Sequence, residues 1–138
     1  MLEQLVYVSR ARDVLTSVLS VSDILQQAGR NNSRDGITGV LAFTSNRFLQ
    51  LIEGHPSALD DLVARLHTDE RHLDVRIIDR IVVTDRAFGG WAMVAPRFTP
   101  RNTQALARLL EDGPQDIRPY RDLLNTMIAE QDQGLASL

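Results

Sequence analysis

The sequence predicts an α+β domain built around one antiparallel sheet, and three observations lead to this fold class. The stretch 47–54, Arg-Phe-Leu-Gln-Leu-Ile-Glu-Gly, is apolar on both faces of a strand around Gln50, as expected for a central strand that is covered on both sides. A turn-rich link separates it from the apolar run at 37–43, which predicts a hairpin. Strand and helix patterns follow one another in the order β-α-β-β-α-β-β. That order is typical of a ferredoxin-like sheet with both helices on one face and an added strand.

The individual elements are assigned from apolar periodicity and from turn residues. A period of two predicts strands, and apolar residues at every third or fourth position predict helices. The predicted strands cover residues 3–9, 37–43, 47–54, 73–83 and 91–95, and the predicted helices cover 21–28 and 56–68. We expect a linker at 10–17, fraying of the first helix at 29–32 and a turn at 33–36, where Asn, Ser, Asp and Gly gather.

Two helices on one face would leave the second face of the sheet bare, although Leu49 and Leu51 need cover there. The remaining sequence predicts a helical pair, one helix from Thr99-Pro100 and a second after the break at Gly113-Pro114. We expect this pair to dock on the second sheet face or to form a dimer interface. Residues 130–138 resemble a frayed tail. The chain is therefore divided into a core domain, 1–97, and a C-terminal helical extension, 98–138.

Composition excludes several classes of protein. The chain contains no Cys, so disulfides, thiolate metal sites and cysteinyl cofactor adducts are excluded. All 15 basic residues are Arg, which excludes a Schiff-base lysine. The net charge of −3 argues against a general nucleic-acid binder. No apolar run is long enough to cross a bilayer, so we expect no membrane association and a cytoplasmic location.

No catalytic or metal signature is visible, and we expect that the chain is not an enzyme. The histidines at 55, 67 and 72 have neither a Cys partner nor zinc-motif spacing. An RNA-binding ferredoxin-like domain would use aromatic side chains such as Tyr7 and Phe48. The central strand lacks the basic, Gly-rich aromatic pattern of such domains, and its other face is too apolar for a solvated platform.

Four polar residues remain to be explained, namely Tyr7, Asn31, Asn32 and Gln50. A buried amide costs free energy unless its donors and acceptor are paired. If Leu5 and Phe48 share the helix-covered face, Tyr7 and Gln50 are neighbours in the core. One interpretation is an Asn helix stop beside a satisfied Gln–Tyr pair. The other is a flat heteroaromatic ligand with carbonyl and imide groups, because amides offer such edges both a donor and an acceptor.

At this point the chain closely resembles the BLUF family, the flavin-binding sensors of blue light, in its short stand-alone form. Five motifs in family order carry the resemblance and extend over residues 3–95. They are Leu-Val-Tyr-Val-Ser at 5–9, Asn-Asn-Ser-Arg-Asp-Gly-Ile-Thr-Gly at 31–39, the central strand at 47–54, Asp-Glu-Arg-His at 69–72 and Arg-Ala-Phe-Gly-Gly-Trp-Ala-Met at 86–93.

The resemblance implies a non-covalently bound flavin between the two helices, with FAD expected and FMN or riboflavin left open. Tyr7 and Gln50 would carry the photochemistry, and Trp91 and Met93 would be the relay candidates. The resemblance implies further flavin contacts from Ile24, Asn31, Asn32, Arg65, Leu66, Asp69, Arg71 and His72.

In the mechanism that the resemblance implies, excited flavin takes an electron and a proton from Tyr7, and the Gln50 amide ends rotated or tautomerised. The altered hydrogen bonding shifts the flavin absorption to the red. The signal would then pass to a separate partner protein through a homo-oligomer, at least a dimer. The alternative functions are a non-photoactive flavin- or ligand-binding adaptor of the same fold and, with less support, a flavin reductase.

Overall fold

The computed structural model describes residues 1–11, 29–44, 47–69, 72–89 and 100–136. Its described strands form an antiparallel sheet in the order β2-β3-β1-β4, with the bounds β1 Leu2–Ala11, β2 Thr38–Thr44, β3 Arg47–Gly54 and β4 His72–Val83. The helices are α2 Pro56–Thr68, α3 Pro100–Asp112 and α4 Ile117–Ala136, and residues 29–35 are also helical. This arrangement confirms the predicted ferredoxin-like α+β class. The predicted strand at 91–95 lies outside the described residues.

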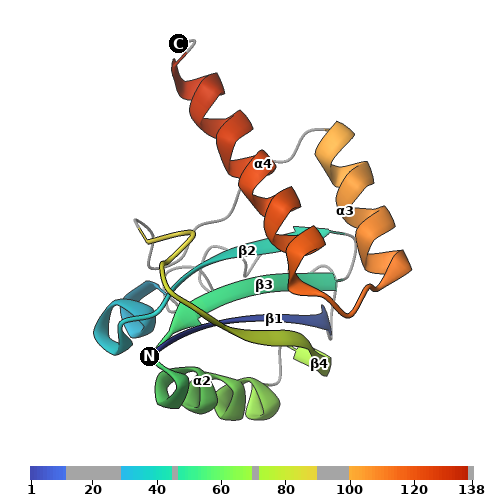
Figure 1. Cartoon of the computed structure of the whole chain (residues 1–138). Coiled ribbons are helices and arrows are strands. Elements are labelled where there is room, and N and C mark those ends of the chain that lie inside the picture. The colour runs from blue at the N-terminus through green and yellow to red at the C-terminus, as the bar shows by residue number, and fades with distance from the viewer. Residues whose placement is uncertain (12–28, 45–46, 70–71, 90–99, 137–138) are drawn as a thin grey trace.

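Strand β3 is the central element of the sheet. Every residue from Phe48 to Gly54 is buried, and β3 pairs with β2 on one side and β1 on the other. Figure 1 shows α2 on one side of the sheet and α3 with α4 on the other. Since side chains alternate along a strand, Gln50 and Ile52 face the side of α2, whereas Leu49 and Leu51 face α3 and α4. The C-terminal pair therefore covers the second sheet face.

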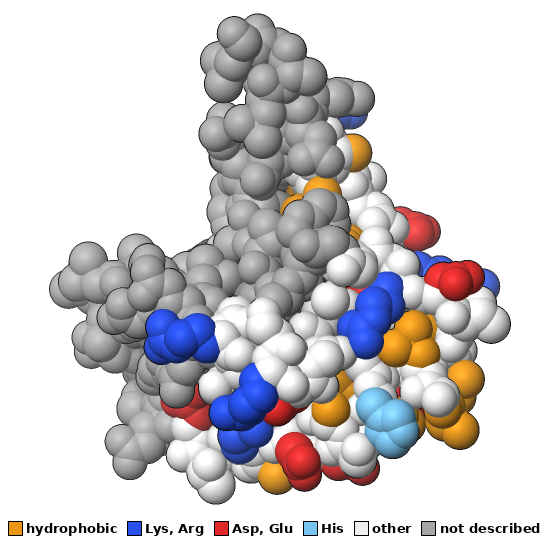
Figure 2. Space-filling model, turned by 90° about the vertical axis from the view of Figure 1, so that its left-hand side faces the viewer, with side chains coloured by type: hydrophobic (Ala, Val, Ile, Leu, Met, Phe, Trp, Pro, Cys, Tyr) orange, Lys and Arg blue, Asp and Glu red, His pale blue; other side chains and the backbone are white. Residues whose placement is uncertain are grey.

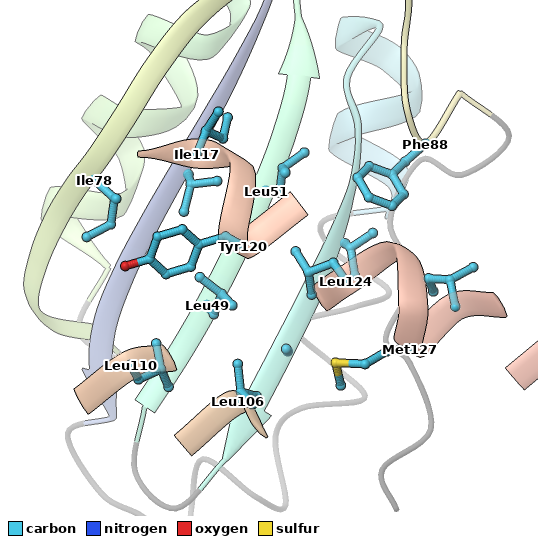
Figure 3. Close-up of a cluster of buried hydrophobic side chains, with 14 residues drawn as sticks. Leu49, Leu51, Ile78, Phe88, Leu106, Leu110, Ile117, Tyr120, Leu124 and Met127 are labelled. Atoms are coloured by element: carbon cyan, nitrogen blue, oxygen red, sulfur yellow. The ribbon is translucent and has the colours of Figure 1, made fainter. Parts of the chain in front are cut away.

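The larger apolar cluster joins the sheet to this helical pair (Figure 3). Tyr120 and Leu124 of α4 and Leu106 of α3 are fully buried in it, against Leu49 and Leu51 of β3. Burying one such side chain contributes about 1.5–3 kcal/mol. The pair is thus an integral layer of the fold and not a loose appendage.

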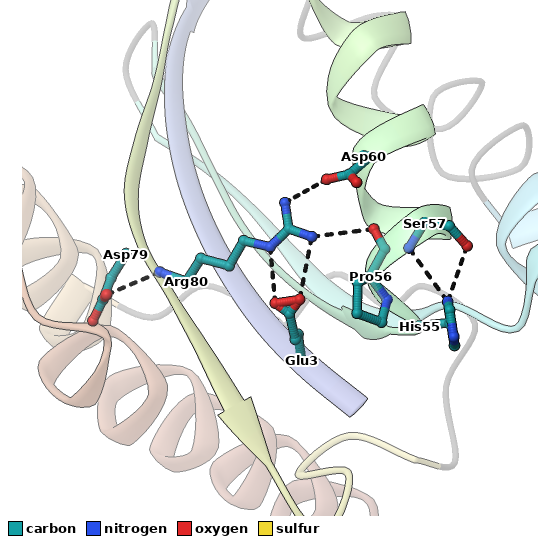
Figure 4. A network of polar contacts seen from close by, with 7 residues as sticks. All are labelled: Glu3, His55, Pro56, Ser57, Asp60, Asp79 and Arg80. Carbon is teal, nitrogen blue, oxygen red and sulfur yellow. Dashed lines mark hydrogen bonds and ion pairs between the residues drawn. The ribbon is translucent and has the colours of Figure 1, made fainter. Parts of the chain in front are cut away.

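Polar contacts fix the edge strand β4 to its neighbours (Figure 4). The guanidinium of Arg80 donates from Nε to Glu3 on β1 (3.1 Å), and from its two terminal nitrogens to Asp60 (2.6 Å) and to the Pro56 carbonyl (3.1 Å) of α2. One side chain therefore holds the start of α2 against β1 and β4. Because exposed ion pairs contribute only about 0–1 kcal/mol, we attribute to Arg80 mainly the orientation of α2.

Three element boundaries differ from the predictions. Strand β1 continues to Ala11, because Arg10 still pairs with Arg47 across the sheet, so the predicted linker cannot begin at residue 10. Helix α4 extends to Ala136, which contradicts the predicted frayed tail from residue 130. Ala, Gln and Glu, all good helix formers, dominate this last part of α4 and explain the extension.

The third difference concerns the first helix, which was predicted to fray at 29–32 and to be followed by a turn at 33–36. Residues 29–35 are helical. Gly36 has a φ of +70°, and the N–H of Ile37 donates to the carbonyl of Asn32 at 2.8 Å. This is the Schellman pattern, in which a left-handed glycine ends the helix and a 6→1 hydrogen bond satisfies a terminal carbonyl. The helix therefore continues through residue 35, about one turn beyond Asn31 and Asn32, and ends at the Gly36 cap.

Candidate functional site

The candidate site is centred on Tyr7 of β1 and Gln50 of β3. The strand register places them directly opposite each other, and they are 1% and 5% exposed. The Tyr7 hydroxyl donates a hydrogen bond to Oε1 of Gln50. A tyrosine and an amide are thus paired in the core, on the face covered by α2.

The surroundings hold the Tyr7 phenol in its neutral form. Burial raises the pKa of Tyr7 far above its ordinary value of 10.0, and the carboxylate of Asp69 raises it further. Both causes disfavour a phenolate, the first by desolvation and the second by charge repulsion. At neutral pH, Tyr7 can therefore lose an electron easily only if it also releases its proton.

Apolar side chains surround this pair. Leu5, Ile37, Ile52, Leu59 and Leu62 are buried in the same cluster. Leu66 of α2, one of the predicted flavin contacts, is half-buried and packs against this cluster. These aliphatic groups suit the faces of a flat aromatic ring, and the Gln50 amide suits its polar edge.

The Asn pair lies on the helix that precedes β2. Asn32 is 1% exposed and Asn31 is half-buried. Figures 1 and 3 show this helix on the same side of the sheet as α2, opposite α3 and α4. The helix that carries Asn31 and Asn32 therefore lies on the same sheet face as Tyr7 and Gln50.

Two further predicted contacts lie at the C-terminal end of α2. The Arg65 guanidinium is 47% exposed and forms an ion pair of 3.4 Å with Asp35, at the end of the first helix. Asp69 caps α2, where its N–H donates to the Leu66 carbonyl at 3.2 Å. The Arg65–Asp35 pair bridges the two helices of this face. Ile24, Arg71, Trp91, Met93 and the side chain of His72 lie outside the described residues.

A further buried polar group, the carboxylate of Glu53, was not among the predicted site residues. This residue is fully buried and lies on the α3–α4 face of β3. Its Oε2 accepts from the Gln4 amide (2.8 Å) and the N–H of Ala87 (2.6 Å), and its Oε1 accepts from Thr38 (3.0 Å) and the N–H of Phe88 (2.8 Å). The sequence did contain a signal for this buried carboxylate, because Glu53 follows Leu49 and Leu51 on the same, otherwise apolar face of the strand.

The surface agrees with the exclusion of a general nucleic-acid binder. On the described part of the face in Figure 2, basic and acidic side chains lie interspersed and form no stripe of one sign. Among the described residues, no group of His, Asp and Glu could hold a metal ion. No helix within the described ranges is long and apolar enough to cross a membrane.

The fold and this site together define a class, the ferredoxin-like α+β domains with a polar pair buried beneath their helices. Within that class the chain belongs to the BLUF family, the sensors of blue light using FAD, because the model of this family matches residues 2–94 of the 138. BLUF domains bind FAD or FMN non-covalently, and the buried amides beside an aliphatic cluster fit such a ring.

Solved structures support this assignment. The structure of BlrB, a BLUF protein in its dark state, is 31% identical and matches 89% of this chain and 94% of its own, with a TM-score of 0.71. The photo-activated state of BlsA gives a TM-score of 0.77 over 92% of this chain at 23% identity, which shows the shared fold. The chain thus matches short BLUF structures almost end to end.

Curated relatives include much longer proteins. The photoactivated adenylate cyclase subunit beta of Euglena longa is 33% identical over 127 residues, which are 91% of this chain and 13% of that protein. The blue light- and temperature-regulated antirepressor BluF of Escherichia coli is 31% identical over 75 residues, 54% of this chain and 18% of that protein. The matched part of this chain therefore spans less than a fifth of the length of these two relatives.

Proposed function

We propose that this BLUF domain is a blue-light photoreceptor in which Tyr7 and Gln50 carry the photochemistry and a separate protein receives the signal. The observation that supports this proposal is the buried hydrogen bond between the Tyr7 hydroxyl and the Gln50 amide oxygen. A bound flavin would supply, on excitation by blue light, the one-electron oxidant for this pair. In this proposal Tyr7 is the donor of both electron and proton, since a phenol is neutral at physiological pH and burial raises the pKa of Tyr7 further.

Gln50 is the lasting element of the switch. The electron and proton return to Tyr7 when the charges recombine, so no net oxidation remains. The Gln50 amide is left rotated or tautomerised, and a donor then stands where an acceptor stood. Gln50 is 5% exposed, so the packed core allows its amide few intermediate orientations. The amide is therefore expected to switch between two defined arrangements.

The other predicted residues hold the cofactor in this proposal. Asn32, with Asn31 beside it, binds the polar edge of the ring, and Ile24, Arg65 and Leu66 flank it. Asp69, Arg71 and His72 line the ribityl and phosphate end. The buried Asn32 and the half-buried Leu66 support these roles.

Residues 1–97 form the sensor in this proposal, and residues 98–138 form the output extension. Trp91 and Met93 relay the change at Gln50 towards the extension. The extension presents the signal to a partner protein in a homo-oligomer of at least two chains. The packing of α3 and α4 directly on β3, the strand that carries Gln50, supports this route.

An absorption spectrum of the purified protein before and after blue light tests the proposed function. We expect a yellow protein whose flavin bands shift reversibly to the red and recover in darkness. Bound flavin without a reversible shift would instead indicate a non-photoactive adaptor. A protein that binds no flavin would contradict the proposal altogether.

A further inference from the structure

The Glu53 carboxylate joins segments that lie far apart in the sequence. Gln4 and Thr38 are its direct neighbours on β1 and β2, so the three side chains form a polar row across the sheet. The other two donors are the backbone N–H groups of Ala87 and Phe88, which follow β4. Glu53 is therefore the point at which the chain after β4 is attached to the central strand.

Two contacts extend from this row to helix α4. Arg121 of α4 donates to the amide oxygen of Gln4 at 3.4 Å. The Phe88 side chain is fully buried in the cluster that contains Leu124 and Met127 of α4 (Figure 3). A displacement of the Ala87–Phe88 backbone would thus reach α4 by a polar path and by an apolar path.

A third contact extends from the same segment to the flavin side. The Arg86 guanidinium donates to the carbonyl of Gly36 (2.7 Å), to the Thr38 hydroxyl (2.8 Å) and to the Glu53 carbonyl (3.2 Å). Gly36 is the cap of the helix that carries Asn32. The segment at 86–88 is therefore tied to the flavin-side helix, to the central strand and to α4.

We propose that Glu53 is a positioning residue that couples the state of the Tyr7–Gln50 pair to helix α4. This inference rests on the proposed photoreceptor function. Glu53 lies on the opposite sheet face from Gln50 and does not take part in the photochemistry. It accepts the backbone N–H groups of Ala87 and Phe88, which precede Trp91 in the sequence, and through these bonds it couples the relay segment to the central strand.

The variant Glu53→Gln weakens this attachment at nearly constant side-chain shape. Each carboxylate oxygen accepts one backbone N–H, from Ala87 or from Phe88. Whichever position the new amide nitrogen takes, it meets a backbone donor, because an amide nitrogen cannot accept a hydrogen bond. One of the two attachments is therefore lost, while Tyr7 and Gln50 are untouched.

The experiment measures the flavin spectrum and backbone hydrogen exchange in darkness and under blue light. In the wild type we expect the red shift together with a light-dependent change of exchange in the peptides of 84–89 and of α4. In Glu53→Gln we expect the red shift to persist and the light-dependent change in α4 to be reduced, because one of the two backbone attachments is lost. A merely structural role would alter exchange equally in darkness and in light.

A second variant, Arg121→Met, separates the polar path from the apolar one without touching Glu53. We expect the light-dependent change to persist at 84–89 and to be reduced in α4. The matched control is Arg118→Met, because Arg118 lies on the same helix, is 72% exposed and pairs with Asp116. It should behave as the wild type does.

The inference is overturned if α4 responds to light in Glu53→Gln as it does in the wild type, or if the wild type shows the red shift without any exchange response in α4. Should Glu53→Gln not fold, Arg121→Met decides, and an unaltered α4 response overturns the polar path. Absence of the red shift in the wild type is a different result, which refutes the proposed function and is read from the spectrum alone.

Discussion

At the scale of single residues, the two tyrosines of the chain offer an internal comparison. Tyr7 and Tyr120 are both buried and both hydrogen-bonded, Tyr7 to Gln50 and Tyr120 to the Pro114 carbonyl at 2.8 Å. They lie on opposite faces of the sheet. The proposed function therefore depends on the hydrogen bond of Tyr7 to the Gln50 amide, because burial and a hydrogen bond alone are also found at Tyr120.

We predict that Tyr7→Phe abolishes the photocycle and leaves flavin bound, because Phe keeps the shape of the ring but cannot release a proton. Removing the buried hydrogen bond should cost about 1 kcal/mol of stability. The measurement is the light-minus-dark absorption spectrum. Tyr120→Phe is the control, since it also loses one hydrogen bond and should retain the full red shift. A normal photocycle in Tyr7→Phe would show that the electron comes from elsewhere.

We predict that Gln50→Leu folds and binds flavin but lacks the normal red shift. Leucine matches the apolar surroundings of Gln50 and offers no amide to the flavin ring or to Tyr7. Absorption spectra before and after blue light provide the measurement. Gln104→Leu, on the exposed face of α3, is the control and should behave as the wild type does. An intact shift in Gln50→Leu would refute the switch role of this amide.

The raised pKa of Tyr7 predicts how the protein responds to alkali. Its folded-state pKa lies far above the value of 10.0 that applies in the unfolded chain. The contribution of Tyr7 to the free energy of unfolding is therefore fully present below pH 10. It is lost as the pH rises above 10, because there the phenol ionises in the unfolded chain and not in the folded one. In Tyr120→Phe, which leaves Tyr7 as the only tyrosine, phenolate absorbance should appear together with the loss of circular dichroism. A phenolate that titrates near pH 10 in the folded protein would contradict this.

At the scale of elements, the strands were predictable because their signal is local. The apolar residues on both faces of the stretch 47–54, around Gln50, indicate a strand covered on both sides, and β3 is such a strand. The faces that β1 and β3 share were not predictable, because alternation alone does not tell which side the helices cover. The pairing of Tyr7 with Gln50 follows from the observed register.

Glu53 was not predictable as a polar centre for a different reason. Two of its four donors are backbone N–H groups from a segment more than thirty positions away. Every residue except proline carries a backbone N–H, so no sequence pattern marks which of these groups bind the Glu53 carboxylate. The end of the first helix was misjudged in a similar way, since the low helix propensity of Gly and Asn was outweighed by the cap at Gly36.

That cap permits a test with a matched pair of glycines. Gly36 has a φ of +70°, which disfavours any residue with a Cβ, whereas Gly29 is helical and its added Cβ would meet nothing within 4 Å. We predict that Gly36→Ala destabilises the protein by about 1 kcal/mol and that Gly29→Ala stabilises it by about 0.5–1 kcal/mol. Denaturant unfolding measures both changes. Equal effects of the two substitutions would argue against the Schellman cap.

At the scale of the whole molecule, the apolar cluster on the second sheet face decides whether the C-terminal helices α3 and α4 are a separate unit. Its buried members come from all four described strands and from α3 and α4. In addition, the N–H of Ile117, at the start of α4, donates to the Asp79 carboxylate of β4 at 2.8 Å. Helices that share one core with the sheet should unfold together with it.

We therefore predict that Leu124→Ala lowers the free energy of unfolding by about 2–5 kcal/mol and promotes flavin release at the same denaturant concentration at which helicity is lost. Leu124 is fully buried on the sheet face opposite Tyr7, so this effect on the cofactor requires a cooperative fold. Leu123→Ala, at a half-buried position of the same helix, is the control and should cost less. Circular dichroism and flavin fluorescence, recorded along one denaturant titration, provide the measurement. Loss of helicity at a clearly lower denaturant concentration than loss of flavin in the variant would show that the helical pair is a separate unit. The light-induced change at Gln50 could then not reach α4 through the packed sheet.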